Sequence, residues 1–343
     1  MNIIIAVLIF CLIVIFHEWG HFLAAKACGV KVNEFCLGFG PTLVSHQGKE
    51  TLYSIKLLPF GGACIMEGEE ESSDDARSFG NKSVWQRMLI VLAGPFFNFI
   101  LAFFMSIVLI ACVGVNYPVL TGVSEGGPAE QAGLEAGDEL VSLNGHKLHF
   151  YSEISVYLYF HHDADMSVTY IRNGEKHTTS LTPVYSEDYG RYMLGVVGGA
   201  YEKRGGVFEV IKYSFYEVGY QIYSCIESLK FMLAGNVSLS EVSGPVGIVK
   251  TIGDTYEASA QDGAYYVFLN MLSIAILLSA NLGVMNLLPI PALDGGRFFI
   301  YVIEAIRRKK MTEKVEMAIN FTGLALLKIL MVVIMANDIY KLF

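Results

Sequence analysis

Four stretches of this chain are apolar over a length that lets a helix cross a lipid bilayer. The hydrocarbon core is about 30 Å thick, which takes about 20 helical residues. We expect the spans within residues 1–25, 88–115, 267–300 and 318–343. Pro289 and Pro291 interrupt the third run, so its last part should be kinked or unwound and sheltered by other helices. The pattern predicts a polytopic α-helical membrane protein with four transmembrane helices.

Basic residues flank these spans unevenly and orient them. They follow the first span, precede the second, and lie between the third and fourth: Lys26, Lys31, Lys82, Arg87 and residues 307–310. Because positive loops stay inside, we expect residues 26–87 and 301–317 to be cytoplasmic and the long stretch from about residue 116 to 263 to lie outside. No basic segment precedes the first span, which predicts a retained anchor instead of a cleaved signal peptide.

The cytoplasmic loop 26–87 alternates apolar and polar residues in two places. Residues 32–39 and 52–58 have this pattern, with glycines around them, so they predict short strands. We expect a membrane-associated β-hairpin or small sheet against the cytoplasmic membrane face. The acidic run from Glu67 to Asp75 is typical of a solvated segment.

Residues 116–206 predict a small extracytoplasmic α+β domain. A short helix, a tight turn and a strand that ends in a hairpin turn are indicated by 127–134, 136–140 and Asn144-Gly145. These residues resemble a PDZ domain, which would offer a groove where an extended peptide adds a strand. A spacer that only blocks access to a site is the alternative.

Residues 207–266 are predicted to form an amphipathic region at the outer membrane surface. Apolar residues recur at three- and four-residue spacing from Phe208 to Met232, with charges between them. A helix packed on the preceding domain is the alternative. Residues 243–248 predict a turn before a short connector into the third span.

Composition agrees with a membrane protein and argues against nucleic acid as a partner. The 343 residues are 53% hydrophobic and 17% charged, and the formal net charge is −9. A net negative charge concentrated outside the membrane and in Glu67–Asp75 is unlike a nucleic-acid footprint. The six cysteines have no C-x-x-C spacing, so they predict no disulfide framework.

The chemistry is indicated by His17-Glu18-Trp19-Gly20-His21 within the first span. Histidines four residues apart on a helix project from one face and can share one ion. In the H-E-x-x-H pattern the glutamate is the general base that accepts a proton from the attacking water. An ionisable side chain inside a membrane span costs about 2.5 to 3.5 kcal/mol of insertion free energy by insertion scales. His17, Glu18 and His21 lie on about one turn, so we expect a compensating partner for them.

Catalytic zinc takes three protein ligands, so a third must come from elsewhere in the chain. Asp294, in Leu293-Asp294-Gly295-Gly296-Arg297, is the best candidate because it lies at the same end of its span as the histidines. Asp-Gly-Gly is also a common turn sequence, and the residues alone leave ligand and turn open.

Three motifs of this chain resemble those of the site-2 protease family of intramembrane zinc metalloproteases, in its bacterial form with one PDZ domain. They are the HEWGH sequence, residues 286–295 (Asn-Leu-Leu-Pro-Ile-Pro-Ala-Leu-Asp-Gly) and Gly94-Pro95-Phe96-Phe97-Asn98. The resemblance implies Zn²⁺ held by His17, His21 and Asp294, with Glu18 as the general base.

Further site residues follow from the same resemblance. It implies that Asn281 and Asn286 bind the substrate backbone, with bracing of the broken third span as the alternative. It also implies that Gly38, Phe39 and Gly40, together with Gly61-Gly62, form a membrane-associated loop that pairs with the substrate as an added strand. Arg297 stands where some members carry histidine, and we assign it no role.

The expected protein is therefore a metalloendopeptidase of the bacterial plasma membrane that cleaves in or beside the transmembrane segments of single-span proteins. Anti-sigma factors and remnant signal peptides are the substrates the resemblance implies, with the PDZ domain as a size filter or peptide binder. A non-catalytic zinc-containing scaffold with a PDZ binding module is the alternative. A metal transporter is a third reading, which the external domain and the lack of inverted repeats disfavour.

Overall fold

The computed structural model describes residues 2–69, 73–162, 164–237 and 242–341. The chain forms two compact units, residues 1–105 with 237–343 and residues 106–236. Among the described residues, four helices are long and apolar enough to cross a membrane: α1 (Asn2–Ala27), α2 (Val84–Val113), α7 (Ala264–Asn286) and α9 (Glu313–Tyr340). All four predicted spans are confirmed as apolar helices, and each observed helix extends beyond its predicted span at one end or the other.

The third predicted span consists of two separate helices. α7 ends at Asn286, and α8 (Asp294–Arg307) begins after a seven-residue link that contains both prolines. A buried ion pair fixes α8 against α2, with Arg87 Nη2 2.5 Å from Glu304 Oε2. Glu304 also accepts a hydrogen bond from the Met311 amide at 2.6 Å. The break therefore leaves α8 anchored independently of the span before it.

The connector into the third span is a helix, which corrects the prediction of a turn and short link. α6 runs from Pro245 to Asp262 and packs against α7. Pro245 is at the start of α6, where its missing N–H and fixed φ are compatible with a helix. Asp338, in the last turn of α9, caps this start by accepting from Gly244 N at 3.0 Å and Gly247 N at 2.8 Å.

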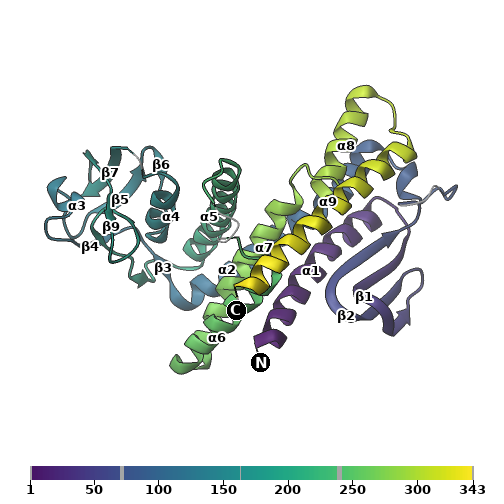
Figure 1. Ribbon diagram of the computed structural model, residues 1–343, viewed down its shortest axis with the longest axis horizontal. Coiled ribbons are helices and arrows are strands. Elements are labelled where there is room, and N and C mark those ends of the chain that lie inside the picture. The colour runs from purple at the N-terminus through teal and green to yellow at the C-terminus, as the bar shows by residue number, and fades with distance from the viewer. Residues whose placement is uncertain (1, 70–72, 163, 238–241, 342–343) are drawn as a thin grey trace. The chain divides into compact units, whose positions relative to one another are not determined.

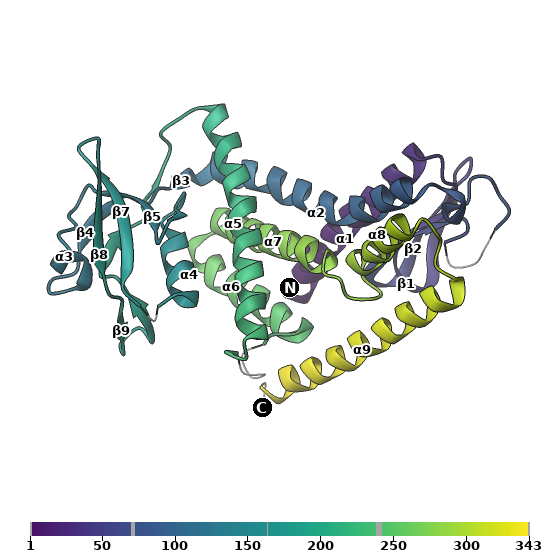
Figure 2. The ribbon, with the colours of Figure 1, turned by 90° about the horizontal axis from the view of Figure 1, so that it is seen from above.

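Two long strands between α1 and α2 form the predicted sheet, which lies against α1 (Figures 1 and 2). β1 spans Val32–Gln47 and β2 spans Leu52–Met66, so both are longer than predicted. Glu34 lies opposite both Ile65 and Leu52. Residues 34–37 of β1 therefore pair with the first part of β2 on one side and with its last part on the other. Residues 62–66 form an outer edge of the sheet. A 3-10 turn, η1 (Phe79–Asn81), precedes α2.

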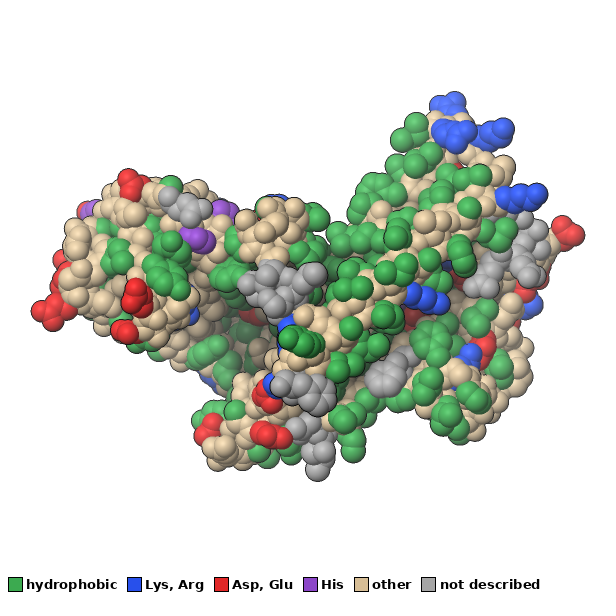
Figure 3. Space-filling model, in the orientation of Figure 1, with side chains coloured by type: hydrophobic (Ala, Val, Ile, Leu, Met, Phe, Trp, Pro, Cys, Tyr) green, Lys and Arg blue, Asp and Glu red, His purple; other side chains and the backbone are tan. Residues whose placement is uncertain are grey.

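Apolar side chains are exposed on this sheet and over the long helices. Figure 3 shows hydrophobic side chains spread over the helical unit, with the basic residues of the α8–α9 link gathered at one end. The exposed apolar residues of the sheet include Phe39, Leu43, Val44, Ile55, Leu57 and Leu58. Such a surface suits contact with lipid, as the sequence predicts.

The second unit is a small α+β domain with its own core. Its four-stranded antiparallel sheet has the order β6-β5-β7-β8. The β5–β6 hairpin turns at Asn144 and Gly145, both with positive φ, as predicted. The sheet strands are β5 (Glu139–Leu143), β6 (His146–Lys147), β7 (Met166–Arg172) and β8 (Glu175–Leu181).

Shorter elements complete this unit around the sheet. The two short helices are α3 (Pro128–Gln131) and α4 (Ser152–Phe160). The short strands pair as β3 (Val115–Asn116) with β12 (Tyr201–Glu202), β4 (Leu120–Val123) with β11 (Val196–Gly198), and β9 (Val184–Ser186) with β10 (Arg191–Met193).

A long helix, α5 (Val207–Leu233), packs along the second unit. Tyr216 stacks on His149 with ring centroids 3.8 Å apart, and Tyr223 stacks on His146 at 4.4 Å. Another part of α5 is exposed and apolar, for example Phe208 at 90% and Leu233 at 83% exposure. One face therefore packs on the domain, as the alternative expectation had it, and the predicted membrane-surface role of the helix stays a prediction.

Candidate metal centre and catalytic site

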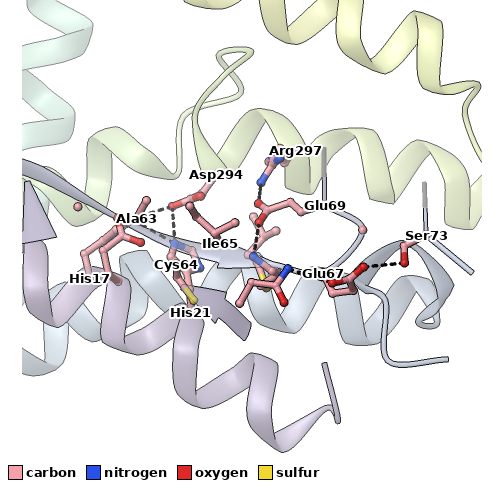
Figure 4. Close-up of a pocket in the computed structure, with 16 residues that line it drawn as sticks. His17, His21, Ala63, Cys64, Ile65, Glu67, Glu69, Ser73, Asp294 and Arg297 are labelled. Carbon is pink, nitrogen blue, oxygen red and sulfur yellow. Dashed lines mark hydrogen bonds and ion pairs between the residues drawn. The ribbon is translucent and has the colours of Figure 1, made fainter. Parts of the chain in front are cut away.

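Three side chains from two distant parts of the chain meet in the helical unit. The Nε2 atoms of His17 and His21 lie 3.2 Å apart on α1. Asp294 Oδ2, at the start of α8, lies 3.2 Å from His17 Nε2 and 3.4 Å from His21 Nε2. Both histidines are 9% exposed. The sequence motifs 273 residues apart thus form one buried cluster, and Figure 4 shows its three members pointing toward one another.

Local sequence explains how Asp294 reaches the histidines. The turn before α8 places Ala292 in the left-handed region with φ 75°. A Cβ on Gly295 would lie 2.3 Å from the Leu288 carbonyl oxygen, and one on Gly296 would lie 2.3 Å from that of Ile290. The two glycines therefore let the first turn of α8 pack against its own preceding link, which fixes the aspartate at the helix start.

α2 crosses α1 at the same level because glycine leaves room there. A Cβ on Gly94 would lie 2.2 Å from His21 Nε2. The Gly94-to-Asn98 motif thereby brings α2 onto the histidine pair, which is the close helix packing that small residues allow in membranes.

The outward nitrogens of both imidazoles are held by α2. His21 Nδ1 lies 2.9 Å from the Ile90 carbonyl oxygen, and His17 Nδ1 lies 3.2 Å from the Asn98 amide. Asn98 is fully buried, and its backbone carbonyl accepts a hydrogen bond from Ser279 on α7 at 2.8 Å. Partners of this kind fix ring orientation, which leaves both Nε2 atoms directed at Asp294.

The arrangement fits a divalent cation. Asp294 Oδ2 is buried and has no hydrogen-bond donor among the described residues. An unpaired buried carboxylate oxygen is costly unless something compensates it. Two imidazole nitrogens and one carboxylate oxygen within 4.8 Å of one another supply the three protein ligands that catalytic zinc takes.

A cavity of about 610 Å³ opens beside this cluster. Glu18 lines it next to the three ligand candidates, so the predicted base faces the space where a peptide would lie. The edge strand 62–66 forms another wall, and Gly62 is close enough that a Cβ there would lie 3.0 Å from Glu18 Cγ. The remaining lining residues are Asn33, Glu67, Gly68, Glu69, Ser73, Val91 and Arg297.

Comparison with known proteins identifies the family. The model of peptidase family M50 matches residues 5–330. The chain belongs to the M50 family, that of the site-2 proteases. A candidate zinc metalloprotease of Clostridium acetobutylicum is 39% identical over 338 residues, which cover 98% of this chain and 97% of that protein. This M50 protease is accordingly a zinc metalloprotease, and Zn²⁺ is its cofactor.

Two relatives carry more specific names. The zinc metalloprotease RasP of Bacillus licheniformis is 32% identical and covers the full length of both chains. The regulator of sigma-W protease RasP of Bacillus subtilis is 31% identical over 100% of this chain and 99% of its own. A solved PDZ domain of an SdrC-like protein from Listeria monocytogenes covers 24% of this chain and 85% of its own, at 16% identity and a TM-score of 0.22.

Of the other predicted residues of this M50 protease, Gly62 lines the cavity and the rest lie outside its lining. Asn281 lies within α7, and its buried Oδ1 has no hydrogen-bond partner in the part of the chain that the structure describes. Asn286 is the last residue of that helix. Gly38, Phe39 and Gly40 lie at the bend of β1, and Phe39 is 55% exposed. Their contacts with substrate stay predictions.

The spacing of residues in the sequence does not predict two features of the site. Asn98 was noted only as part of a motif, since its contact with His17 depends on how α2 crosses α1. Residues 62–66 line the cavity because they lie at the sheet edge, which depends on strand pairing.

Proposed function

We propose that this protease hydrolyses peptide bonds within or next to the transmembrane segments of single-span proteins in a bacterial plasma membrane. The observation that carries the proposal is the position of two of the three ligand candidates, His17 and His21, on α1, a helix long and apolar enough to cross the bilayer. A protease centred there meets its substrates at the membrane.

In this proposal His17, His21 and Asp294 hold Zn²⁺ and Glu18 is the general base. Zinc supplies a Lewis acid that polarises the peptide carbonyl and increases the acidity of water at neutral pH. Glu18 accepts the proton of the attacking water, and its place on the cavity wall beside the ligands supports that role. Ile90 and Asn98 keep the two imidazoles oriented while this happens.

The substrate must be extended before cleavage, because the peptide bonds of a helix are shielded by its own hydrogen bonds. The edge strand 62–66 passes along the cavity and offers a place for an added strand. Asn281 and Asn286 would bind unpaired backbone groups of the unwound substrate, and Gly38, Phe39 and Gly40 would support the sheet at the membrane.

Anti-sigma factors and remnant signal peptides are the proposed substrates. The printed name of the Bacillus subtilis relative, a regulator of sigma-W protease, supports the first class. The second unit would lie outside the cell as a PDZ-like size filter or peptide binder, with α5 at the membrane surface and the zinc site near the cytoplasmic face. The basic residues of the α8–α9 link support this orientation.

The decisive experiment compares wild-type protein with Glu18→Gln on a labelled single-span substrate in proteoliposomes. We expect the variant to keep stoichiometric zinc and to lose about 10²- to 10⁴-fold in kcat, as removal of a general base does. Equal cleavage by the two proteins would refute the mechanism. Zinc-dependent substrate binding without cleavage by wild type would support the scaffold alternative.

A further inference from the structure

The strand 62–66 has one edge open to the cavity, and the direction of its amides can be assigned. Backbone N–H groups along a strand point alternately to its two sides. The Glu67 amide donates to Lys31 O, next to β1, at 2.9 Å. The amides of Met66 and Cys64 therefore point to the opposite side, toward the cavity. Those two N–H groups are the donors that an added substrate strand would use.

Side-chain carboxylates occupy both of these donors. The Cys64 amide faces the carboxylate of Glu18. The Met66 amide points at Glu69 Oε2, 3.4 Å away. A carboxylate oxygen accepts the same kind of hydrogen bond as a substrate carbonyl, so Glu69 takes the position of a substrate acceptor at the end of the edge strand.

A turn directs Glu69 back to this position. Gly68 has φ +66°, a left-handed conformation that glycine adopts without strain. Glu67, just before it, is fixed by Lys31, Asn33 and Ser73 at 3.2, 3.0 and 2.7 Å. These contacts hold the pKa of the Glu67 carboxyl down, at about 2, so Glu67 stays ionised and anchors the turn at neutral pH. The turn that carries Glu69 is thus held at Glu67 by three side-chain contacts.

Arg297 holds Glu69 from the other side. Its guanidinium pairs with Glu69 Oε1, and the two side chains are 24% and 15% exposed. Arg297 lies three residues after Asp294 on α8, so it projects from nearly the same helix face as that ligand candidate. Figure 4 shows Glu69 between Arg297 and the edge strand.

We propose that Glu69, held by Arg297, caps the substrate-binding edge of the sheet at Met66 and is displaced when a substrate strand adds there. The proposal rests on the function proposed above, because it specifies what the incoming strand must compete with. At 3.4 Å the contact with the Met66 amide is long for a hydrogen bond, so a well-aligned peptide carbonyl replaces it readily. The cap satisfies the open edge in the resting enzyme and excludes short or poorly aligned segments.

If the Glu69–Arg297 pair only stabilised the structure, its removal would change the kinetics differently than if Glu69 competed with the substrate. Removing a brace that shapes the site lowers kcat and thermal stability. Removing a competitor lowers KM and leaves kcat nearly constant, because the cap is already displaced in the enzyme–substrate complex.

The test is steady-state cleavage of a fluorogenic single-span substrate by the zinc-loaded full chain in proteoliposomes. We expect Glu69→Gln to lower KM about fivefold, since a charged acceptor outcompetes a neutral one by roughly that factor. Glu69→Ala should lower KM at least as much, and Arg297→Gln should act in the same direction because it releases the carboxylate. In all three, kcat should stay within about twofold of wild type.

Matched controls remove the same charges nearby without touching the cap. Asp74→Asn neutralises an exposed acid of the same loop, and Arg307→Gln neutralises an exposed base of the same helix. Both should keep wild-type KM. A KM that is unchanged or raised in Glu69→Gln, or that falls equally in Asp74→Asn, would overturn the cap.

Binding in a Glu18→Gln background separates this proposal from the proposed function. The labelled substrate should bind about fivefold more tightly to Glu18→Gln/Glu69→Gln than to Glu18→Gln alone, whether or not the wild type cleaves it. Equal affinity of the two would refute the cap even when cleavage is established. Absence of cleavage by wild type, with the affinity difference present, would refute only the protease function.

Discussion

Each unit holds an aspartate with a buried carboxylate oxygen, Asp138 in the second unit and Asp294 in the helical unit, and the two differ in their hydrogen-bond partners. Asp138 in the second unit is fully buried, and its oxygens accept from Arg172 Nε and Nη2 at 2.7 Å and from the Glu135 amide at 2.8 Å. The Asp294 side chain in the helical unit is 17% exposed, but its Oδ2 atom is buried, has no hydrogen-bond partner among the described residues and faces two imidazoles. A buried carboxylate whose oxygens all accept hydrogen bonds stabilises the fold, whereas one with an oxygen that has no donor can bind a cation.

The sharpest way to break this comparison is Asp294→Ala. We expect loss of bound zinc and of all measurable cleavage, because only the two imidazoles remain and catalytic zinc takes three protein ligands. Metal analysis of the purified protein measures the first effect. The thermal unfolding of the second unit should not change, and unaltered zinc content in this variant would remove Asp294 from the ligand set.

The reciprocal change, Asp138→Ala, should affect stability and spare the metal. It removes the Asp138 carboxylate from Arg172, but Arg172 keeps the Gly133 carbonyl and Glu135 as partners and its side chain is 27% exposed. We therefore expect a loss of about 2 to 3 kcal/mol, below the usual range for fully buried pairs. Thermal unfolding of the full chain with zinc quantification measures both effects. Loss of zinc with no change in unfolding would reverse the assignment of the two aspartates.

Lowering the pH should reproduce part of the stability loss of Asp138→Ala, because it protonates the Asp138 carboxylate. Although burial opposes it, bonding to Arg172 and to the Glu135 amide holds the pKa of Asp138 below its usual value of 3.8. The unfolded state therefore binds more protons between the two pKa values. The stabilisation is present above pH 3.8 and is lost as pH falls through the folded-state pKa, and this dependence should be absent in Asp138→Ala.

Asn98→Leu sharpens the comparison at a position that contacts a ligand without binding metal itself. Loss of the contact to His17 Nδ1 should weaken zinc about 10- to 100-fold, the usual effect of removing such a partner. Competition with a graded series of chelators measures the affinity. Ser106→Ala, at another fully buried polar residue of α2, is the matched control, and an equal loss of zinc in both variants would contradict a specific role for Asn98.

Much of the fold was predictable because the membrane simplifies the pattern. Long apolar runs give the four spans, and the His-x-x-x-His spacing puts His17 and His21 on one helix face without knowledge of tertiary structure. The residues alone left Asp294 open between ligand and turn, and the structure places it at the start of α8 against both imidazoles.

What sequence could not supply depends on contacts between distant segments. Pro245 suggested a turn, but a proline suits the first position of a helix as well, and the cap that supports α6 comes from Asp338 on another helix. Gly61-Gly62 was named as part of the substrate-pairing loop, but the position of residues 62–66 at the sheet edge was not predicted, because a strand's place in a sheet follows from pairing. Arg297 had no assigned role because Glu69, its partner, is 228 residues away.

The cap that Asp338 provides for α6 has a practical consequence for truncation or labelling near residue 338. Asp338 accepts from amides at the head of α6, 94 residues earlier in the chain. A truncation or a bulky fusion there would remove or disturb the cap of α6, the helix that precedes the third predicted span. Fluorescent or affinity labels are better placed elsewhere, such as at the exposed Asn173–Gly174 tip of the β7–β8 hairpin in the second unit.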